Sequence, residues 1–84
     1  MKRDDVYVLI NAERTRQAKG WAGPHGWGSG DCASADVESI VKVAVLGEEC
    51  GEVARAVLDH DDSNLRTELV QVAAVAVAWL EGIA

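Results

Sequence analysis

The sequence predicts an all-α fold: a small bundle of about three helices in one domain over residues 1–84, completed by dimerisation into a four-helix-bundle-like core. Three segments space their apolar residues as helices do. Glycine-rich or polar breaks separate these segments. A chain of this length buries only about 60% of its unfolded surface, so a partner subunit would add stability.

The first predicted helix covers residues 3–19, where Val6, Leu9 and Ile10 keep helical spacing. Asp4 or Asp5 suits its N-terminal cap, and Gly20 is expected to end it. Residues 20–35 follow as a loop, because glycine, proline and tryptophan dominate this stretch.

The second predicted helix covers residues 36–60. Its expected apolar stripe consists of Val43, Leu46, Cys50, Val53 and Val57. Because Cys50 lies in this stripe, we expect it to be a buried free thiol and not a disulfide partner.

The third predicted helix runs to about Glu81, with Ser63 or Asn64 as its cap and Gly82 as its stop signal. From Val70 to Leu80 only Gln71 is polar. A helix that is apolar on all sides must be buried on all sides, and three helices of one chain cannot surround it. We therefore expect a homodimer or homotetramer, with Trp79 in the core or at the subunit interface.

Charge and hydropathy narrow the classes of function. The net charge of −6 disfavours nucleic acid as a direct partner, yet allows a nucleotide substrate if a metal supplies positive charge. The apolar stretch 69–80 is too short to span a bilayer, and residues 1–5 do not resemble a signal peptide. We expect a cytoplasmic protein without a membrane partner.

Two short polar steps carry the candidate chemistry. Glu49 and Glu52 share one helix face, and Glu68 and Gln71 share another. If the two helices are neighbours, three carboxylates and one amide converge, and such oxygen ligands suit Mg²⁺. The alternative is a solvated acidic face, with Glu68 interacting with the N-terminal dipole of its helix.

The surroundings of Glu49 favour a metal site over a solvated acidic face. Val45, Leu46 and Val53 lie one turn away from it, and a buried carboxylate is costly unless it is protonated, paired or bound to a metal. Glu48 adds a further like charge to the same turn, and this crowding raises carboxyl pKa values when no cation is present.

The stretches LGEECGEVA, 46–54, and LRTELVQVA, 65–73, resemble the MazG-like family of all-α nucleoside triphosphate pyrophosphohydrolases. The hallmark of that family is an ExxE step on one helix and an ExxD step on the next. The resemblance covers residues 40–81. It implies a dimer or tetramer that holds Mg²⁺ through Glu49, Glu52, Glu68 and Gln71. Gln71 stands where the family has Asp.

The resemblance also implies a reaction, in which a nucleoside triphosphate is cleaved to a monophosphate and pyrophosphate. Glu49 or Glu52 would orient the attacking water, with Glu48 as a spare base or outer partner. Lys42 and Arg66 would neutralise the leaving group, or else belong to an ordinary solvated surface.

The tryptophans of the loop offer a site for the base. Trp21 and Trp27 would stack on a nucleobase, or else plug the open end of the bundle. Two other functions remain open: a catalytically weakened dimer that binds nucleotide or a partner protein, and a structural helical dimer whose acids are solvated.

Overall fold

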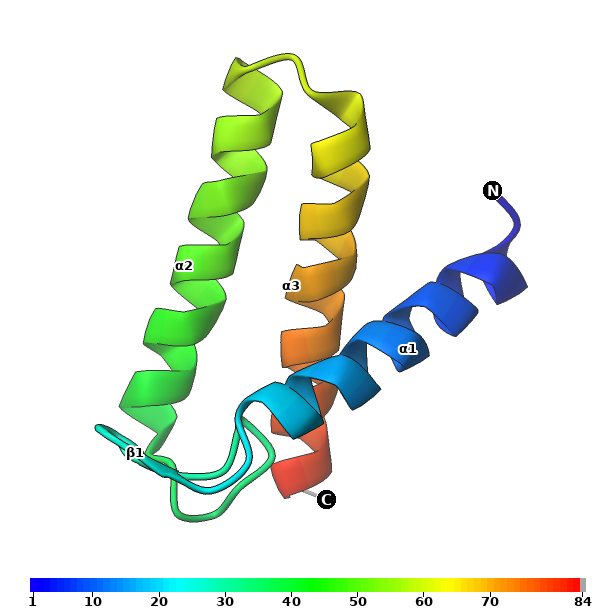
Figure 1. Cartoon of the computed structure of the whole chain (residues 1–84). Helices are drawn as coiled ribbons and strands as arrows, with labels where there is room; N and C mark the ends of the chain where they lie inside the picture. The colour runs from blue at the N-terminus through cyan, green and yellow to red at the C-terminus, as the bar shows by residue number, and fades with distance from the viewer. Residues whose placement is uncertain (84) are drawn as a thin grey trace.

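The computed structural model describes residues 1–83 and confirms the all-α class (Figure 1). Helix α1 covers Arg3–Gly20, α2 covers Ser39–Leu58 and α3 covers Asp62–Ile83. Within the loop, Pro24–His25 and Gly28–Ser29 form a short antiparallel hairpin, β1 and β2, which the composition did not indicate.

Helix α3 is the centre of the fold. Helices α2 and α3 form an antiparallel pair, and α1 lies across the other side of α3 (Figure 1). In this view the loop between α1 and α2 lies below the lower end of α2 and beside the lower end of α3. This arrangement brings the middle of α2, the middle of α3 and the second half of α1 together.

The predicted N-terminal caps of two helices were wrong. The N-terminal cap of α1 is Lys2, with no side-chain hydrogen bond, and the predicted caps Asp4 and Asp5 lie inside the first turn. There their negative charges interact favourably with the positive end of the helix dipole. At α3, the Asp61 carboxylate accepts a hydrogen bond from the Asn64 backbone N–H at 3.1 Å. The capping side chain therefore precedes the predicted ones.

Gly82 was expected to stop the third helix, but α3 continues through it to Ile83. A Cβ atom at Gly82 would lie 2.8 Å from the backbone oxygen of Ala33. The glycine therefore permits a close approach between α3 and the loop.

The core is built from small side chains around α3. Its buried hydrophobic residues are Cys32, Val37, Ala56, Ala74, Val75 and Ala78. Positions 70–79 of α3 are all buried or half-buried within the single chain. The premise that three helices of one chain cannot surround α3 was therefore wrong, because α1, α2 and the loop cover most of it. Self-association itself stays a prediction.

The predicted stripe of α2 was also partly wrong. Cys50 is exposed, and Val43 and Val57 are more than half exposed, at 52% and 54%. Helix α2 is apolar on two sides, and the side that carries Glu49 and Ala56 turns toward α3. Both cysteines are free thiols.

In the part of the chain that the structure describes, none of the helices combines the length and the apolar character needed to cross a membrane.

Candidate metal centre and aromatic pocket

Three carboxylates from two helices meet in the middle of the α2–α3 pair. Glu49 and Glu52 come from α2 and Glu68 from α3, and one oxygen atom of each lies within 4.8 Å of the others. Glu68 is buried, Glu49 is half-buried and Glu52 is exposed. The cluster thus has a dry base and an opening to solvent beside Glu52.

Gln71 belongs to the same cluster, as its spacing from Glu68 predicts. With its amide nitrogen facing the acids, it donates hydrogen bonds to Glu68 Oε2 at 2.9 Å and to Glu49 Oε2 at 3.1 Å. This orientation is the one that satisfies the hydrogen-bond network. Rotating the amide by half a turn would present its oxygen to the same point, so Gln71 is also suited to metal coordination.

The acids of the cluster repel one another. A side-chain hydrogen bond with Glu52 raises the pKa of Glu68 to about 7, and burial and the charges of Glu52, Glu49 and Glu13 act in the same direction. Burial, followed by the charges of Glu52 and Glu48, raises the pKa of Glu49. Within residues 1–83 none of the ion pairs includes an acid of this cluster. A divalent cation would relieve this repulsion directly.

Glu13 is a further acid near the cluster, and sequence reasoning did not assign it to the site. Its negative charge contributes to the raised pKa values of both Glu49 and Glu68. An available signal was its place within the apolar spacing of the first helix, after Val6 and Ile10. Locating it beside Glu68, however, required knowing how α1 crosses α3.

A pocket of about 140 Å³ opens beside the carboxylates. Trp21 and Trp27 from the loop, Glu48 and Glu49 from α2, and Gln71 from α3 all line it. Further wall residues are Arg16, Gln17, Gly30, Asp31, Cys32, Val45, Val75 and Ala78. The pocket therefore joins an aromatic wall to the edge of the acidic cluster.

The aromatic wall consists of three rings. The ring centroids of Trp21 and Trp27 lie 5.2 Å apart, and the His25 ring lies 4.5 Å from Trp27 and 5.6 Å from Trp21. His25 Nε2 donates a hydrogen bond to the Gly30 carbonyl oxygen. This bond ties β1 to the segment that follows β2 and positions the rings.

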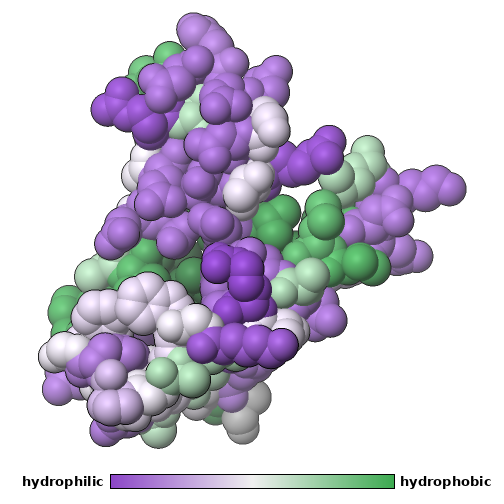
Figure 2. Space-filling view, in the orientation of Figure 1, coloured by the Kyte–Doolittle hydropathy of each residue, from purple (hydrophilic) through white to green (hydrophobic). Residues whose placement is uncertain are grey.

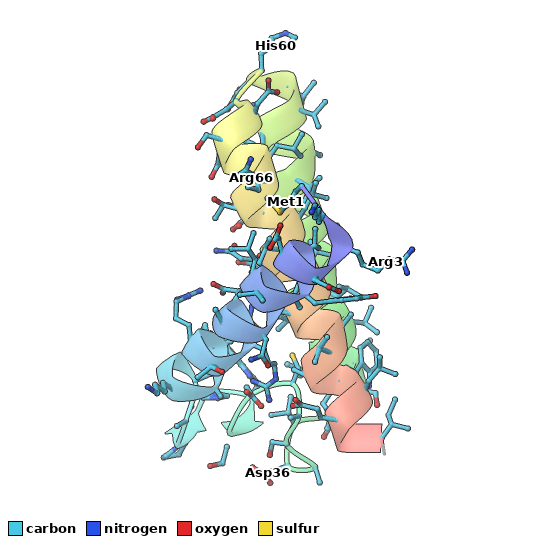
Figure 3. All side chains as sticks on the ribbon, turned by 90° about the vertical axis from the view of Figure 1, so that its right-hand side faces the viewer. Met1, Arg3, Asp36, His60 and Arg66 are labelled. Atoms are coloured by element: carbon cyan, nitrogen blue, oxygen red, sulfur yellow. The ribbon has the colours of Figure 1, made fainter. Side chains whose placement is uncertain are left out.

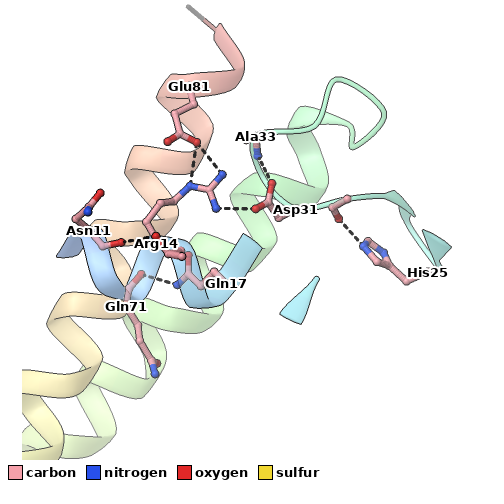
Figure 4. Close-up of polar contacts among 10 residues, drawn as sticks. Asn11, Arg14, Gln17, His25, Asp31, Ala33, Gln71 and Glu81 are labelled. Carbon is pink, nitrogen blue, oxygen red and sulfur yellow. Dashed lines mark hydrogen bonds and ion pairs between the residues drawn. The ribbon is translucent and has the colours of Figure 1, made fainter. Parts of the chain in front are cut away.

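An arginine network fastens the loop to the helices (Figure 4). The guanidinium of Arg14 donates to Asp31 Oδ2 at 2.7 Å and, through two nitrogens, to Glu81 Oε2 at 2.9 and 2.7 Å. Asp31 Oδ1 also accepts the Ala33 N–H at 2.9 Å. Arg14 thus joins α1, the loop and the end of α3.

A second set of contacts shapes the hairpin itself. Asp36 Oδ2 accepts the Ser29 N–H at 2.6 Å, and the Ser34 hydroxyl donates to the Ser29 carbonyl at 2.7 Å. Gly28 has a φ of 138°, and a Cβ atom there would lie 2.7 Å from the Asp36 carbonyl oxygen. Glycine is therefore required at this turn.

The structure places the two predicted phosphate-neutralising cations away from this pocket. Lys42 is buried, with 6% exposure, and does not line the pocket. Arg66 lies on the α1 side of α3, in grooves that it shares with Leu9 and Val70. Arg16 does line the pocket, whereas the sequence had favoured a solvated helix face for it over contact with phosphates.

Comparison with known proteins gave no match to a family model, to a curated protein or to a solved structure. The function is therefore argued from the geometry of the carboxylate cluster and the aromatic pocket.

Proposed function

We propose that this chain is a Mg²⁺-dependent nucleoside triphosphate pyrophosphohydrolase that releases a monophosphate and pyrophosphate. The observation that carries the proposal is the convergence of Glu49, Glu52 and Glu68 within 4.8 Å, next to a pocket walled by tryptophans. The resemblance of 46–54 and 65–73 to the MazG-like family supports the same assignment.

The donor set suits Mg²⁺. This ion prefers a few carboxylate ligands together with waters and substrate phosphates. Glu49, Glu52 and Glu68 supply the carboxylates, and the Gln71 amide reaches the same point. When bound, Mg²⁺ offsets the charge of phosphate oxygens and makes a nearby water more acidic.

The residues of the chain divide the remaining work. Glu68 is the buried anchor, while the exposed Glu52 lies where solvent and phosphate enter. Glu48 lines the pocket beside Glu49, and there it orients the attacking water and accepts its proton. The water attacks the α-phosphorus, and the bond from that phosphorus to the bridging oxygen breaks, so that pyrophosphate leaves.

Trp21 and Trp27 hold the base in this proposal, since aromatic faces stack on bases at about 1–3 kcal/mol each. The pocket volume of about 140 Å³ is smaller than the roughly 300–1,000 Å³ that encloses a whole ligand of drug size. The pocket therefore takes the base end of the substrate, and the phosphates lie outside it across the acidic cluster.

A second copy of the chain is part of the proposal, and α2 offers the surface for it. Val43, Cys50 and Val57 are exposed on its outer side, and Gly47 and Ala54 continue the same row. Their spacing alternates between three and four residues, as in a helix–helix seam. A Cβ atom at Gly47 would meet nothing within 4 Å in the chain, so no contact within the chain requires a glycine there. Close packing of a partner helix would require one.

Gln71 favours a second candidate function, which is nucleotide binding without cleavage. An amide contributes no charge, whereas the related family places Asp at this position. Fewer negative charges weaken the hold on Mg²⁺, and a protein of this kind would bind a nucleotide and release it intact.

The test is hydrolysis of each nucleoside triphosphate with Mg²⁺ by the purified chain, followed as pyrophosphate release. We expect the wild type to release pyrophosphate, Glu49→Gln to lose at least about 100-fold in kcat/KM, roughly 2.7 kcal/mol, and the exposed Glu38→Gln control to keep the wild-type rate. Binding without release, with a gain of activity in Gln71→Asp, would establish the second function. Absence of both binding and release contradicts the proposal.

A further inference from the structure

Glu13 and Arg16 on α1 form a bidentate ion pair next to the proposed metal centre. Arg16 Nε lies 2.8 Å from Glu13 Oε1, and its Nη2 lies 2.5 Å from Glu13 Oε2. The two side chains differ in exposure, at 13% for Glu13 and 65% for Arg16. The acid therefore points into the protein, while most of the cation remains in solvent.

The crossing of α1 over α3 places Glu13 beside the cluster. Gln17 Nε2 donates to the Gln71 backbone oxygen at 3.4 Å, which fixes where the helices meet (Figure 4). Helices α1 and α3 both run downward in Figures 1 and 3. Glu13 lies one turn before Gln17 and Glu68 one turn before Gln71, so Glu13 and Glu68 lie at the same level. The groove that Glu13 and Arg16 share with Thr67 confirms this register.

The cluster has two unmet needs in the chain by itself. Glu68 is more than nine-tenths buried, with 8% exposure, and it pairs with none of the cations of residues 1–83. A buried carboxylate in this state requires a proton or a cation. Gln71, one turn after Glu68, is neutral, so the ligand positions on α2 and α3 supply three negative charges, and Glu13 is an acid that a third helix brings near them.

We propose that Glu13 supplies the fourth negative charge of the metal centre and that Arg16, released from Glu13 when a cation binds, contacts the phosphate chain of the substrate. This inference rests on the proposed function and adds to it a charged residue from α1 and a phosphate-binding residue. Geometry supports both roles, because Glu13 lines a groove with Thr67, next to Glu68, and Arg16 lines the pocket with Glu49.

Arg16 is well placed for the second role. It lines the aromatic pocket together with Glu48 and Glu49, and it also lines the groove that contains Glu13. Its side chain therefore borders both the groove that holds its partner Glu13 and the pocket proposed for the substrate. Arg14 is not available for such a role, because Asp31 and Glu81 already bind its guanidinium from two sides.

The test is calorimetric titration of the whole chain, first with Mg²⁺ alone and then with inorganic triphosphate in saturating Mg²⁺. We expect Glu13→Gln to weaken Mg²⁺ binding by about 10–100-fold, the range found when a partner of metal ligands is removed. We expect Arg16→Gln to give opposite changes: Mg²⁺ binding as tight as in the wild type or tighter, and triphosphate binding weaker by at least about tenfold.

Matched controls are Glu38→Gln and Arg3→Gln, which remove one charge of each sign from exposed positions. Both should stay within about twofold of the wild type, as isolated surface charges do. Thermal unfolding of each variant checks that it is folded.

Two results would overturn the inference alone. One is a wild type that binds Mg²⁺ with Glu13→Gln binding it equally well. The other is an Arg16→Gln variant that loses Mg²⁺ and triphosphate in parallel, because this indicates a merely structural pair. A wild type that binds neither ligand contradicts the proposed function together with the inference.

Discussion

Glu68 combines burial with negative neighbours, and this conflict has a measurable consequence for stability. Its pKa is raised from the ordinary 4.5 to about 7. Between these values the folded chain holds a proton that the unfolded chain has lost. The stabilisation is therefore complete below pH 4.5 and disappears as the pH rises through 7.

We accordingly predict that the metal-free chain loses stability between pH 5 and 7.5, by on the order of 1–3 kcal/mol at ~1.4 kcal/mol per pKa unit. Urea unfolding at a series of pH values measures this loss. In Glu68→Gln the slope should be much smaller, and Mg²⁺ should reverse it in the wild type because the cation replaces the proton. A wild type that is equally stable at both pH values would disprove the assignment of the raised pKa.

In the proposed metal centre, Gln71 is the residue that distinguishes cleavage of a nucleotide from binding alone. Its amide donates hydrogen bonds to both Glu68 and Glu49, and these bonds stabilise the cluster without a metal. The same amide gives the cluster one negative charge fewer than an Asp would. An Asp at this position would increase the repulsion among the acids when no metal is bound, and would strengthen the binding of a cation. Stability of the empty centre and affinity for the cation are therefore opposed at this residue.

At the scale of elements, local signals predicted most of the fold. The three helices follow from apolar spacing and from the breaks between them. The meeting of Glu49, Glu52 and Glu68 was predictable because spacing within a helix fixes a face, and a short turn makes consecutive helices neighbours. The Asp61 cap was not predictable in the same way, because several neighbouring polar residues could make that contact equally well.

The crossing of α1 was not predictable in this way. Whether Glu13 faces the cluster depends on the angle at which α1 meets α3, and that angle comes from tertiary packing. Which side of α2 turns toward α3 was ambiguous for a related reason. Cys50 and Ala56 belong to two different apolar sides of one helix, and sequence alone does not say which side the chain itself covers.

The outer face of α2 leads to a prediction about its glycines. Gly47 and Gly51 lie in mid-helix and a Cβ atom at either would meet nothing in the chain. Ala should favour the helix by about 1 kcal/mol at each position. If a second copy packs closely there, Gly47→Ala and Gly51→Ala should raise helix content yet weaken self-association.

Sedimentation equilibrium measures that association, and Gly20→Ala is the matched control, because a Cβ atom at Gly20 also meets open space but lies on α1. Unchanged association in both α2 variants would place the second copy elsewhere. The next surface to test would be the recess between α1 and the α2–α3 pair, because hydrophobic residues gather there (Figure 2).

For the molecule as a whole, the small core explains why ligands should matter to stability. Among residues 1–83 no large side chain is fully buried, while several large apolar side chains are exposed, including Ile40, Leu58 and Leu80. A chain of this kind is stabilised by whatever binds its folded form. A cation between α2 and α3 and a second copy on α2 would both do so.

We propose above all that Glu49, Glu52 and Glu68 together bind one divalent cation. Thermal unfolding with and without Mg²⁺ in the wild type and in Glu68→Gln tests it most directly. At a hundred times the dissociation constant, binding adds about 2.7 kcal/mol, so Tm should rise by roughly 10 °C or more in the wild type and hardly at all in the variant. An equal shift in both, or no shift in the wild type at any Mg²⁺ concentration, would contradict the account.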